Sequence, residues 1–155
     1  MARQPLALAG WRLLTGLAAP LAPLLLRQRA ARGKEDPARL GERQGRSQVS
    51  RPEGRLVWIH GASVGESLSA LPLVERLQAD GATVLVTSGT VTSATMMRMR
   101  LPPGALHQFV PLDTPGAVAR FLDHWKPDMG LFVESDLWPN LILAAARRGV
   151  RLALV

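Results

Sequence analysis

From residue 56 onward, short apolar runs alternate with segments whose apolar residues recur at helical spacing. The apolar runs are rich in strand-forming residues and predict strands over 56–60, 83–87, 107–110, 129–133 and 151–155. The intervening segments predict helices over 66–79, 92–100, 115–125 and 139–148. Strands that alternate with helices at this spacing form βαβ units with right-handed crossovers. The pattern therefore predicts an α/β fold, a Rossmann-like parallel sheet with helices on both faces.

The N-terminal residues follow another pattern, which predicts a membrane-associating segment over 1–30. Residues 13–26 form an uncharged, mostly apolar run of 14 residues, with Trp11 and Arg12 before it and arginines after it. As a helix this run is about 21 Å long, short of the roughly 30 Å hydrocarbon core, and Pro20 and Pro23 interrupt it. Arginine and tryptophan at an apolar boundary are typical of anchoring at a membrane surface. A spanning helix and a cleaved signal peptide are the alternatives.

Residues 31–55 are polar and contain several glycines and prolines. This composition predicts a mostly solvated connector, with a short helix around 37–43. The chain of 155 residues is long enough for one domain with a real core, which we expect over 56–155.

Charge separates the N-terminal part of the chain from the rest. Through residue 55 there are 11 Lys and Arg against 4 Asp and Glu, while the remainder holds 8 against 8. The whole excess of +7 therefore lies in the first third, which suggests an anionic partner surface. A membrane surface fits better than nucleic acid, because the basic residues flank an apolar block and form no patch with stacking aromatics. The absence of cysteine excludes a thiolate metal site, and the three scattered histidines disfavour a zinc cluster.

The loop after the first predicted strand carries the first candidate chemistry. Ser63 and Glu66 match a capping box, in which serine caps a helix and glutamate bonds back to the cap amide. A catalytic carboxylate at the same place is the alternative, and the two roles are compatible. A phosphate-binding loop is disfavoured, because Gly61 and Gly65 stand one residue too close and Glu66 occupies the lysine position. The dinucleotide fingerprint G-x-G-x-x-G is also missing.

In a parallel sheet the loops that follow the strands gather along one edge. Besides Glu66, this edge would carry hydroxyls at 87–93, the 111–114 loop and the segment 134–140, with Glu134, Trp138 and Asn140. Hydroxyls, amides and carboxylates beside an indole suit a sugar or phosphosugar ligand. The structural alternatives are that the hydroxyls cap the next helix, that Asp136 starts a helix and that Trp138 lies in the core.

The residues of these loops, taken together, resemble a known family. Trp58 to Glu66, Thr87 to Thr90, Pro111 to Asp113 and Glu134 to Asn140 are similar to motifs of the Kdo (3-deoxy-D-manno-octulosonic acid) transferases of lipopolysaccharide synthesis. The resemblance covers about residues 30–155 and includes 33–36 and Glu42-Arg43 upstream. One departure is Gly61, which stands where alanine is common; we expect this change to leave the loop intact.

The resemblance implies the N-terminal half of a GT-B glycosyltransferase, which binds a lipid A precursor. The C-terminal domain, which would bind CMP-Kdo, is missing from this chain, so the chain alone is expected to be inactive. Glu66 is implied as the general base and Glu134 as a second catalytic carboxylate, with no metal and no cofactor besides the donor CMP-Kdo. The expected location is the cytoplasmic face of the inner membrane. The residues expected to bind substrate are Ser63, Gly65, Thr87, Ser88, Thr90, Trp138 and Asn140.

A function of another class also fits the sequence. A non-catalytic, membrane-associated binding module would keep the basic N-terminal part and the polar sheet edge without a reaction of its own. A nucleotide-dependent oxidoreductase is a more distant alternative.

Overall fold

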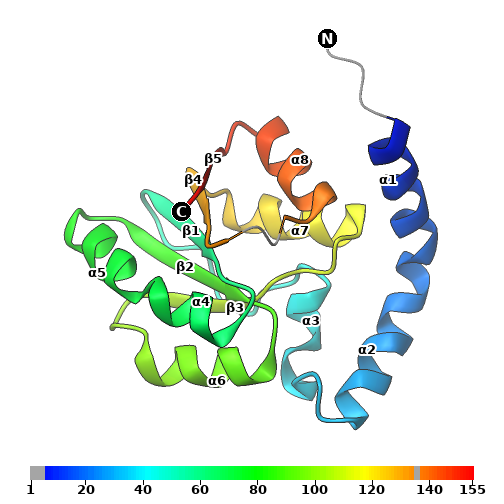
Figure 1. Ribbon diagram of the computed structural model, residues 1–155, viewed down its shortest axis with the longest axis horizontal. Helices are drawn as coiled ribbons and strands as arrows, with labels where there is room; N and C mark the ends of the chain where they lie inside the picture. Colours follow the sequence, from blue (N-terminus) through cyan, green and yellow to red (C-terminus); the bar gives the residue numbers. More distant parts are fainter. Residues whose placement is uncertain (1–5, 135–136) are drawn as a thin grey trace.

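A five-stranded parallel sheet lies at the centre of the molecule (Figure 1). The computed structural model describes residues 6–134 and 137–155. All five predicted strands are confirmed, with each end within one residue of the prediction. They are β1 (Leu56–His60), β2 (Thr83–Ser88), β3 (Leu106–Phe109), β4 (Met129–Phe132) and β5 (Arg151–Leu154).

The strand order is β3-β2-β1-β4-β5, so β1 is the central strand. It pairs in parallel with β2 on one side, from Leu56 opposite Thr83 to His60 opposite Thr87, and with β4 on the other. The chain therefore runs outward from β1 to β3 and then returns past β1 to β4. Such a reversal is a topological switch point, the place where open α/β sheets bind ligands.

Helices cover both faces of the sheet, as predicted (Figure 1). The side chains of β1 alternate between two hydrophobic clusters: Trp58 packs with Phe121, whereas Val57 packs with Val74 and Met97. The first cluster holds α7 and α8 against the sheet, and the second holds the other three helices. The helices are α4 (Val64–Ser69), α5 (Leu71–Ala79), α6 (Val91–Arg100), α7 (Pro115–Trp125) and α8 (Pro139–Arg147).

Trp58 is the centre of the cluster beneath α7 and α8. Its ring meets Phe121 and Phe132 edge to face, with centroids 5.2 and 5.0 Å apart. Gly130 in β4 makes room for this ring, because a Cβ there would come within 3.0 Å of the indole. The buried indole N–H donates to the Thr87 hydroxyl at 2.8 Å, which satisfies its polar group.

The predicted helices at 92–100, 115–125 and 139–148 are confirmed to within one residue at each end. The single helix predicted over 66–79 is wrong: the structure has two helices, with Ala70 between them. Pro72 explains the break, because proline has no N–H to donate to the carbonyl of Leu68.

Residues 6–31 form a helical arm that runs along one side of the molecule (Figure 1). The arm consists of α1 (Leu6–Ala18), the 3₁₀ turn η1 (Ala19–Leu21) and α2 (Ala22–Ala31). The expected interruption is a 3₁₀ turn at Pro20, whereas Pro23 lies in the first turn of α2. By length and composition, this run is long and apolar enough to cross a membrane. It is nevertheless attached to the domain, because α1 contacts α7 and α8 and the Leu26 side chain is fully buried.

The apolar residues of the arm mostly face away from the domain. Their spacing of three, four or seven residues places them on one side of a helix. Six leucines of the arm are 50–70% exposed, which is unusual for so many leucines in one segment. They are Leu13, Leu14, Leu17, Leu21, Leu24 and Leu25.

The segment between the arm and β1 is more ordered than a solvated connector. The predicted short helix over 37–43 takes the form of the 3₁₀ turn η2 (Pro37–Arg39) followed by α3 (Leu40–Arg43). Glu35 and Arg43 are only 4% and 6% exposed, so the expectation of a solvated segment is wrong at these positions. Their burial is possible because the two side chains form an ion pair, 2.8 Å between Nε and Oε2. The boundaries at 30 and 55 stay a prediction.

Candidate functional site at the carboxyl edge of the sheet

Glu66 and Glu134 lie after the two strands that flank the switch point. Glu66 is in the first turn of α4, which follows β1, and Glu134 follows β4. Because β1 and β4 are hydrogen-bonded neighbours, the segments that follow them leave the sheet at adjacent positions. This is the arrangement that the sequence predicts for the two carboxylates.

Ser63 caps α4 as predicted, accepting a hydrogen bond from the Glu66 N–H at 3.2 Å. The return bond differs from the predicted capping box. The Glu66 carboxylate accepts from the Ala62 N–H at 2.7 Å through Oε2, and from the Ser63 hydroxyl at 2.8 Å through Oε1. It therefore reaches one residue further back than the cap amide. Two donors orient this half-buried carboxylate, one on each oxygen.

Two glycines bring the loops of this edge into close contact. A Cβ on Gly61 would come within 2.9 Å of the Ser67 backbone nitrogen, and one on Gly89 within 3.1 Å of the Ala62 carbonyl oxygen. Alanine at position 61 would therefore push the loop against the backbone of α4. Glycine at this position leaves the loop intact, as predicted, with Ser63 capping α4. Gly65 is exposed, and a side chain there would meet open space.

Arg43 connects the next two loops, a role that sequence analysis missed. Its guanidinium donates to the Gly89 carbonyl, and also to the Val110 carbonyl at 3.1 Å. Its own carbonyl accepts from the Leu112 N–H at 2.8 Å. Glu35 neutralises the buried charge, so the segment before β1 holds the loops after β2 and β3 in place.

The three hydroxyls predicted to bind substrate, two at the end of β2 and one just after it, are engaged within the protein. The Thr87 side chain is fully buried, and its Oγ1 lies 2.9 Å from His60 Nδ1 and accepts from Trp58. Thr90 caps α6 in a reciprocal capping box with Ser93, which is the structural alternative left open above. Ser88 is also fully buried and bonds to His107. Thr87 and Ser88 are fully buried in this structure, and their contact with a substrate stays a prediction.

His107, the partner of Ser88, is half-buried and also meets Arg39. Arg39 Nη2 approaches His107 Nδ1 at 3.1 Å, and because a guanidinium only donates, Nδ1 accepts and Nε2 carries the ring proton. Nε2 then donates to the Ser88 hydroxyl at 2.8 Å. Burial, followed by the charges of Arg39 and Arg43, lowers the pKa of His107 from its usual 6.5 to about 3. The ring is therefore neutral near neutral pH.

Glu134 has a left-handed backbone, with φ at 61°, and its side chain is exposed. A non-glycine residue in this region is uncommon and is found disproportionately at functional sites. Trp138 is also partly exposed, at 39%, so the alternative that it lies in the core is wrong. The predicted helix start at Asp136 lies outside the described residues.

Asn140 is buried and holds three elements together. Its side-chain N–H groups donate to the Asp113 carbonyl at 2.6 Å and to the Thr15 hydroxyl of α1 at 2.9 Å. Its amide nitrogen is therefore used inside the protein, and the predicted contact of Asn140 with substrate stays a prediction.

Asp113 is the second residue that sequence analysis missed. Its carboxylate accepts from the backbone N–H groups of Asn140 at 3.2 Å and Leu141 at 2.9 Å, so it caps α8 from a distant loop. It also accepts from the indole N–H of Trp11 at 2.7 Å. One carboxylate thus attaches both the start of α8 and the N-terminal arm to the end of β3.

Among the described residues, no group of three or more His, Cys, Asp or Glu side chains is placed to hold a metal ion. The described part of the edge therefore presents two carboxylates, backbone amides and an indole. Such groups can bind a polar ligand and remove a proton from it.

Comparison with known proteins gives one family. The sequence profile of the 3-deoxy-D-manno-octulosonic-acid transferases (kdotransferases) matches residues 38–155. A mitochondrial protein of Arabidopsis thaliana, described as a probable 3-deoxy-D-manno-octulosonic acid transferase, is 42% identical over 94% of this chain. The 3-deoxy-D-manno-octulosonic acid transferases of Rickettsia bellii and Bordetella pertussis are 44% and 39% identical over 75% and 87% of it.

The match covers only part of these relatives. The aligned residues make up 33% of the Arabidopsis protein, 28% of the Rickettsia protein and 34% of the Bordetella protein. This chain thus spans about a third of the length of the relatives that it matches.

Proposed function

This chain belongs to the 3-deoxy-D-manno-octulosonic acid (Kdo) transferase family, and on that premise we propose that it is the acceptor-binding half of a Kdo transferase. The complete enzyme would move Kdo from CMP-Kdo to a lipid A precursor in lipopolysaccharide synthesis. The donor domain would follow this chain and close over the carboxyl edge of the sheet. The 155 residues alone would bind the acceptor without transferring Kdo.

The position of Glu66 carries this proposal. Its carboxylate stands at the switch point, oriented by the Ala62 N–H and the Ser63 hydroxyl, and it keeps lone pairs for a further hydrogen bond. We assign Glu66 as the general base. As the acceptor hydroxyl oxygen bonds to the anomeric carbon of Kdo, its proton passes to Glu66 and the bond from that carbon to the CMP phosphate breaks. No metal is assigned to this step.

The remaining site residues take supporting roles in this proposal. Glu134, after the neighbouring strand, would orient the acceptor, with Trp138 stacking on a sugar ring. Ser63 and Thr90, which cap α4 and α6, and Gly65 in the first turn of α4 are exposed and would line the acceptor side. Thr87, Ser88 and Asn140 would act indirectly by holding these loops in place.

The helical arm would place the enzyme at the cytoplasmic face of the inner membrane, where a lipid acceptor is found. A helix that spans the bilayer would have to leave the domain, because Trp11 and Thr15 of α1 bond to Asp113 and Asn140. The attached arm, with its leucines exposed on one side, therefore supports a helix that lies on the membrane surface.

The test is a chain completed with the donor domain of a relative, compared with its Glu66→Gln variant. Glutamine keeps the size of the side chain; its oxygen can accept from the Ala62 N–H and its amide can donate to the Ser63 oxygen. An amide cannot act as the base, so we expect the initial rate with CMP-Kdo and lipid A precursor to fall by roughly 10²-fold or more. The melting temperature should hardly change.

Glu75→Gln is the matched control, because Glu75 is an exposed residue of α5 and the charge change is the same. It should leave both rate and melting temperature unchanged. Near-normal turnover by Glu66→Gln would assign Glu66 to capping alone and make Glu134 the next candidate. A completed chain without any transfer would contradict the proposed activity and favour the binding module.

A further inference from the structure

A cationic hollow lies between the N-terminal arm and the two helices that it contacts. It has a volume of about 130 Å³ and is lined from α1 by Leu8 and Arg12, from α7 by Pro115 and Val118, and from α8 by Leu143 and Arg147, among others. A water molecule needs roughly 10–15 Å³ of such space, so the hollow can hold a group as large as a phosphate. None of its lining residues belongs to the loop that carries Glu66.

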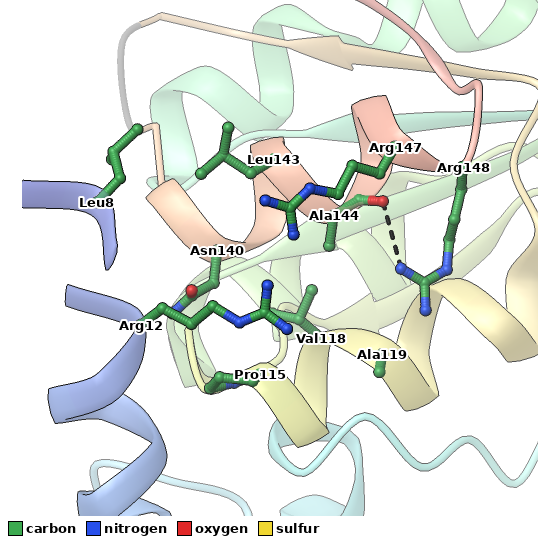
Figure 2. Close-up of a pocket in the computed structure, with 10 residues that line it drawn as sticks. All are labelled: Leu8, Arg12, Pro115, Val118, Ala119, Asn140, Leu143, Ala144, Arg147 and Arg148. Atoms are coloured by element: carbon green, nitrogen blue, oxygen red, sulfur yellow. Dashed lines mark hydrogen bonds between the residues drawn. The ribbon is translucent and has the colours of Figure 1, made fainter. Parts of the chain in front are cut away.

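Two arginines reach this hollow from opposite sides. Figure 2 shows the side chains of Arg12 and Arg147 extending toward the same space from α1 and α8. Within residues 6–134 and 137–155, neither guanidinium has an acidic partner. Arg148 differs, because it donates to the Ala144 carbonyl at 3.3 Å and pairs with Asp123 at 2.9 Å. Two like charges that face one space, neither paired with a described carboxylate, favour an anionic ligand with several oxygens.

An apolar hollow adjoins the cationic one. It has a volume of about 390 Å³, and its lining consists of Ala9, Leu13, Gly16 and Leu17 together with Arg12 and Pro115, which line both hollows. A free anion would gain nothing from this second space. A molecule with a phosphate and a hydrocarbon chain would fill both.

We propose that these two hollows form a binding site for one anionic bilayer phospholipid. Its phosphate would lie between Arg12 and Arg147, and one acyl chain would follow α1 past Gly16. This site rests on the membrane association proposed above and gives it a specific ligand. The exposed leucines of the arm would enter the same leaflet, so the bound lipid would fix the rotation of the domain on the membrane.

The experiment uses the 155-residue chain and dihexanoyl phosphatidylglycerol, a short-chain lipid, as a monomer in solution. Without a membrane surface, general attraction between charges contributes little, and binding reports the site. We expect the Arg12→Gln/Arg147→Gln variant to bind the lipid at least about tenfold more weakly. The control is Arg27→Gln/Arg32→Gln, which removes the same charge from exposed positions outside the hollow and should bind like the unchanged chain.

A second pair of variants tests the apolar part without changing charge. Gly16→Leu would fill the apolar hollow, whereas Gly10→Leu places the same side chain where a Cβ meets open space. We expect Gly16→Leu to weaken binding of the lipid and to leave binding of glycerol phosphate unchanged, while Gly10→Leu affects neither. Melting temperatures of all four variants verify that each is folded.

Several outcomes would overturn the site. If the two double arginine variants lose equal affinity for the lipid, the binding reflects general electrostatic attraction. If glycerol phosphate binds as tightly as the lipid, the hollow is a site for free phosphate. Displacement of the lipid by lipid A precursor would assign the hollow to the acceptor.

Vesicles of phosphatidylglycerol and phosphatidylcholine separate the two proposals. If the chain binds vesicles but not the monomeric lipid, membrane association stands and the site fails; if it binds neither, both fail.

Discussion

The same side-chain chemistry has different uses at different residues of the sheet edge. The Glu66 carboxylate is half-buried and oriented by two donors, whereas Thr87 and Ser88 are fully buried and bond to tryptophan and histidine side chains. The Thr87 and Ser88 hydroxyls keep hydrogen-bonding capacity beyond these bonds, but neither reaches the surface. Burial therefore distinguishes the half-buried carboxylate of Glu66 from the fully buried hydroxyls of Thr87 and Ser88.

His107 provides a prediction at the residue scale. Its pKa is lowered from 6.5 in the unfolded chain to about 3 in the folded one, so between these values the unfolded chain binds the extra proton. The free energy of unfolding therefore decreases as the pH falls below 6.5. At pH 5 the histidine alone should account for a loss of about 2 kcal/mol relative to neutral pH.

The measurement is urea unfolding of the chain and of His107→Gln between pH 7 and pH 5. Acidic residues titrate in both proteins, so the informative quantity is the difference between the two curves. We expect the unchanged chain to lose more stability than the variant over this range. Two parallel curves would contradict the lowered pKa.

At the scale of elements, the attachment of α1 and the start of α8 depend on one loop. Trp138 precedes α8 without a side-chain cap, and Asp113 from the loop after β3 supplies the missing acceptor. The same carboxylate holds Trp11 of α1, and Asn140 holds Thr15. The arm is thus attached to the start of the helix that follows Glu134.

Asp113→Ala should destabilise the protein through α8. It would leave the buried N–H groups of Asn140 and Leu141 without an acceptor and remove the bond to Trp11. We expect the free energy of unfolding to fall by about 2–4 kcal/mol. Asp123→Ala is the control, because Asp123 is exposed and forms a surface ion pair with Arg148. It should cost about 1 kcal/mol or less. Equal effects in chemical unfolding would be evidence against the capping role.

At the scale of the whole molecule, charge and apolar surface lie on the same part of the chain. The excess of +7 belongs to residues 1–55, and the exposed leucines belong to the arm within it, while residues 56–155 are neutral. Deleting residues 1–30 would also remove the buried Leu26 and the bonds of Trp11 and Thr15. Varying the salt concentration therefore tests membrane association without removing these contacts, which deletion would do.

We expect the chain to sediment with phosphatidylglycerol vesicles at low salt and to be released at high salt. Raising the salt from about 0.01 M to about 1 M shortens the Debye length from about 30 Å to about 3 Å, which screens the arginines from the lipid phosphates. Vesicles of phosphatidylcholine alone should bind weakly at both salt concentrations, through the leucines only. Binding to the anionic vesicles that is independent of salt would contradict a role for the basic residues.

The sequence by itself determined the sheet and most of its helices. Strand and helix periodicity depend on neighbouring residues, and the cap at Thr114 with Pro115 at the start of α7 is equally local. The two helices in place of one over 66–79 also have a local cause, Pro72. The apolar residues of that segment keep helical spacing across Pro72, so the spacing alone predicted one helix. The cap that Ser63 forms on α4 was predictable for the same reason, because Ser63 and Glu66 lie three residues apart.

Only the tertiary structure decided which polar residues are buried and what they hold. Asp113 bonds to Trp11 across 102 residues and to Leu141 across 28, and Arg43 bonds to Val110 across 67. The local sequence does not reveal such partners. A charged residue in a polar segment has the same neighbours in the sequence whether its side chain is solvated or buried in an ion pair. The same holds for the arm: its leucines are apolar in any context, and only its attachment to α7 and α8 leaves them facing outward.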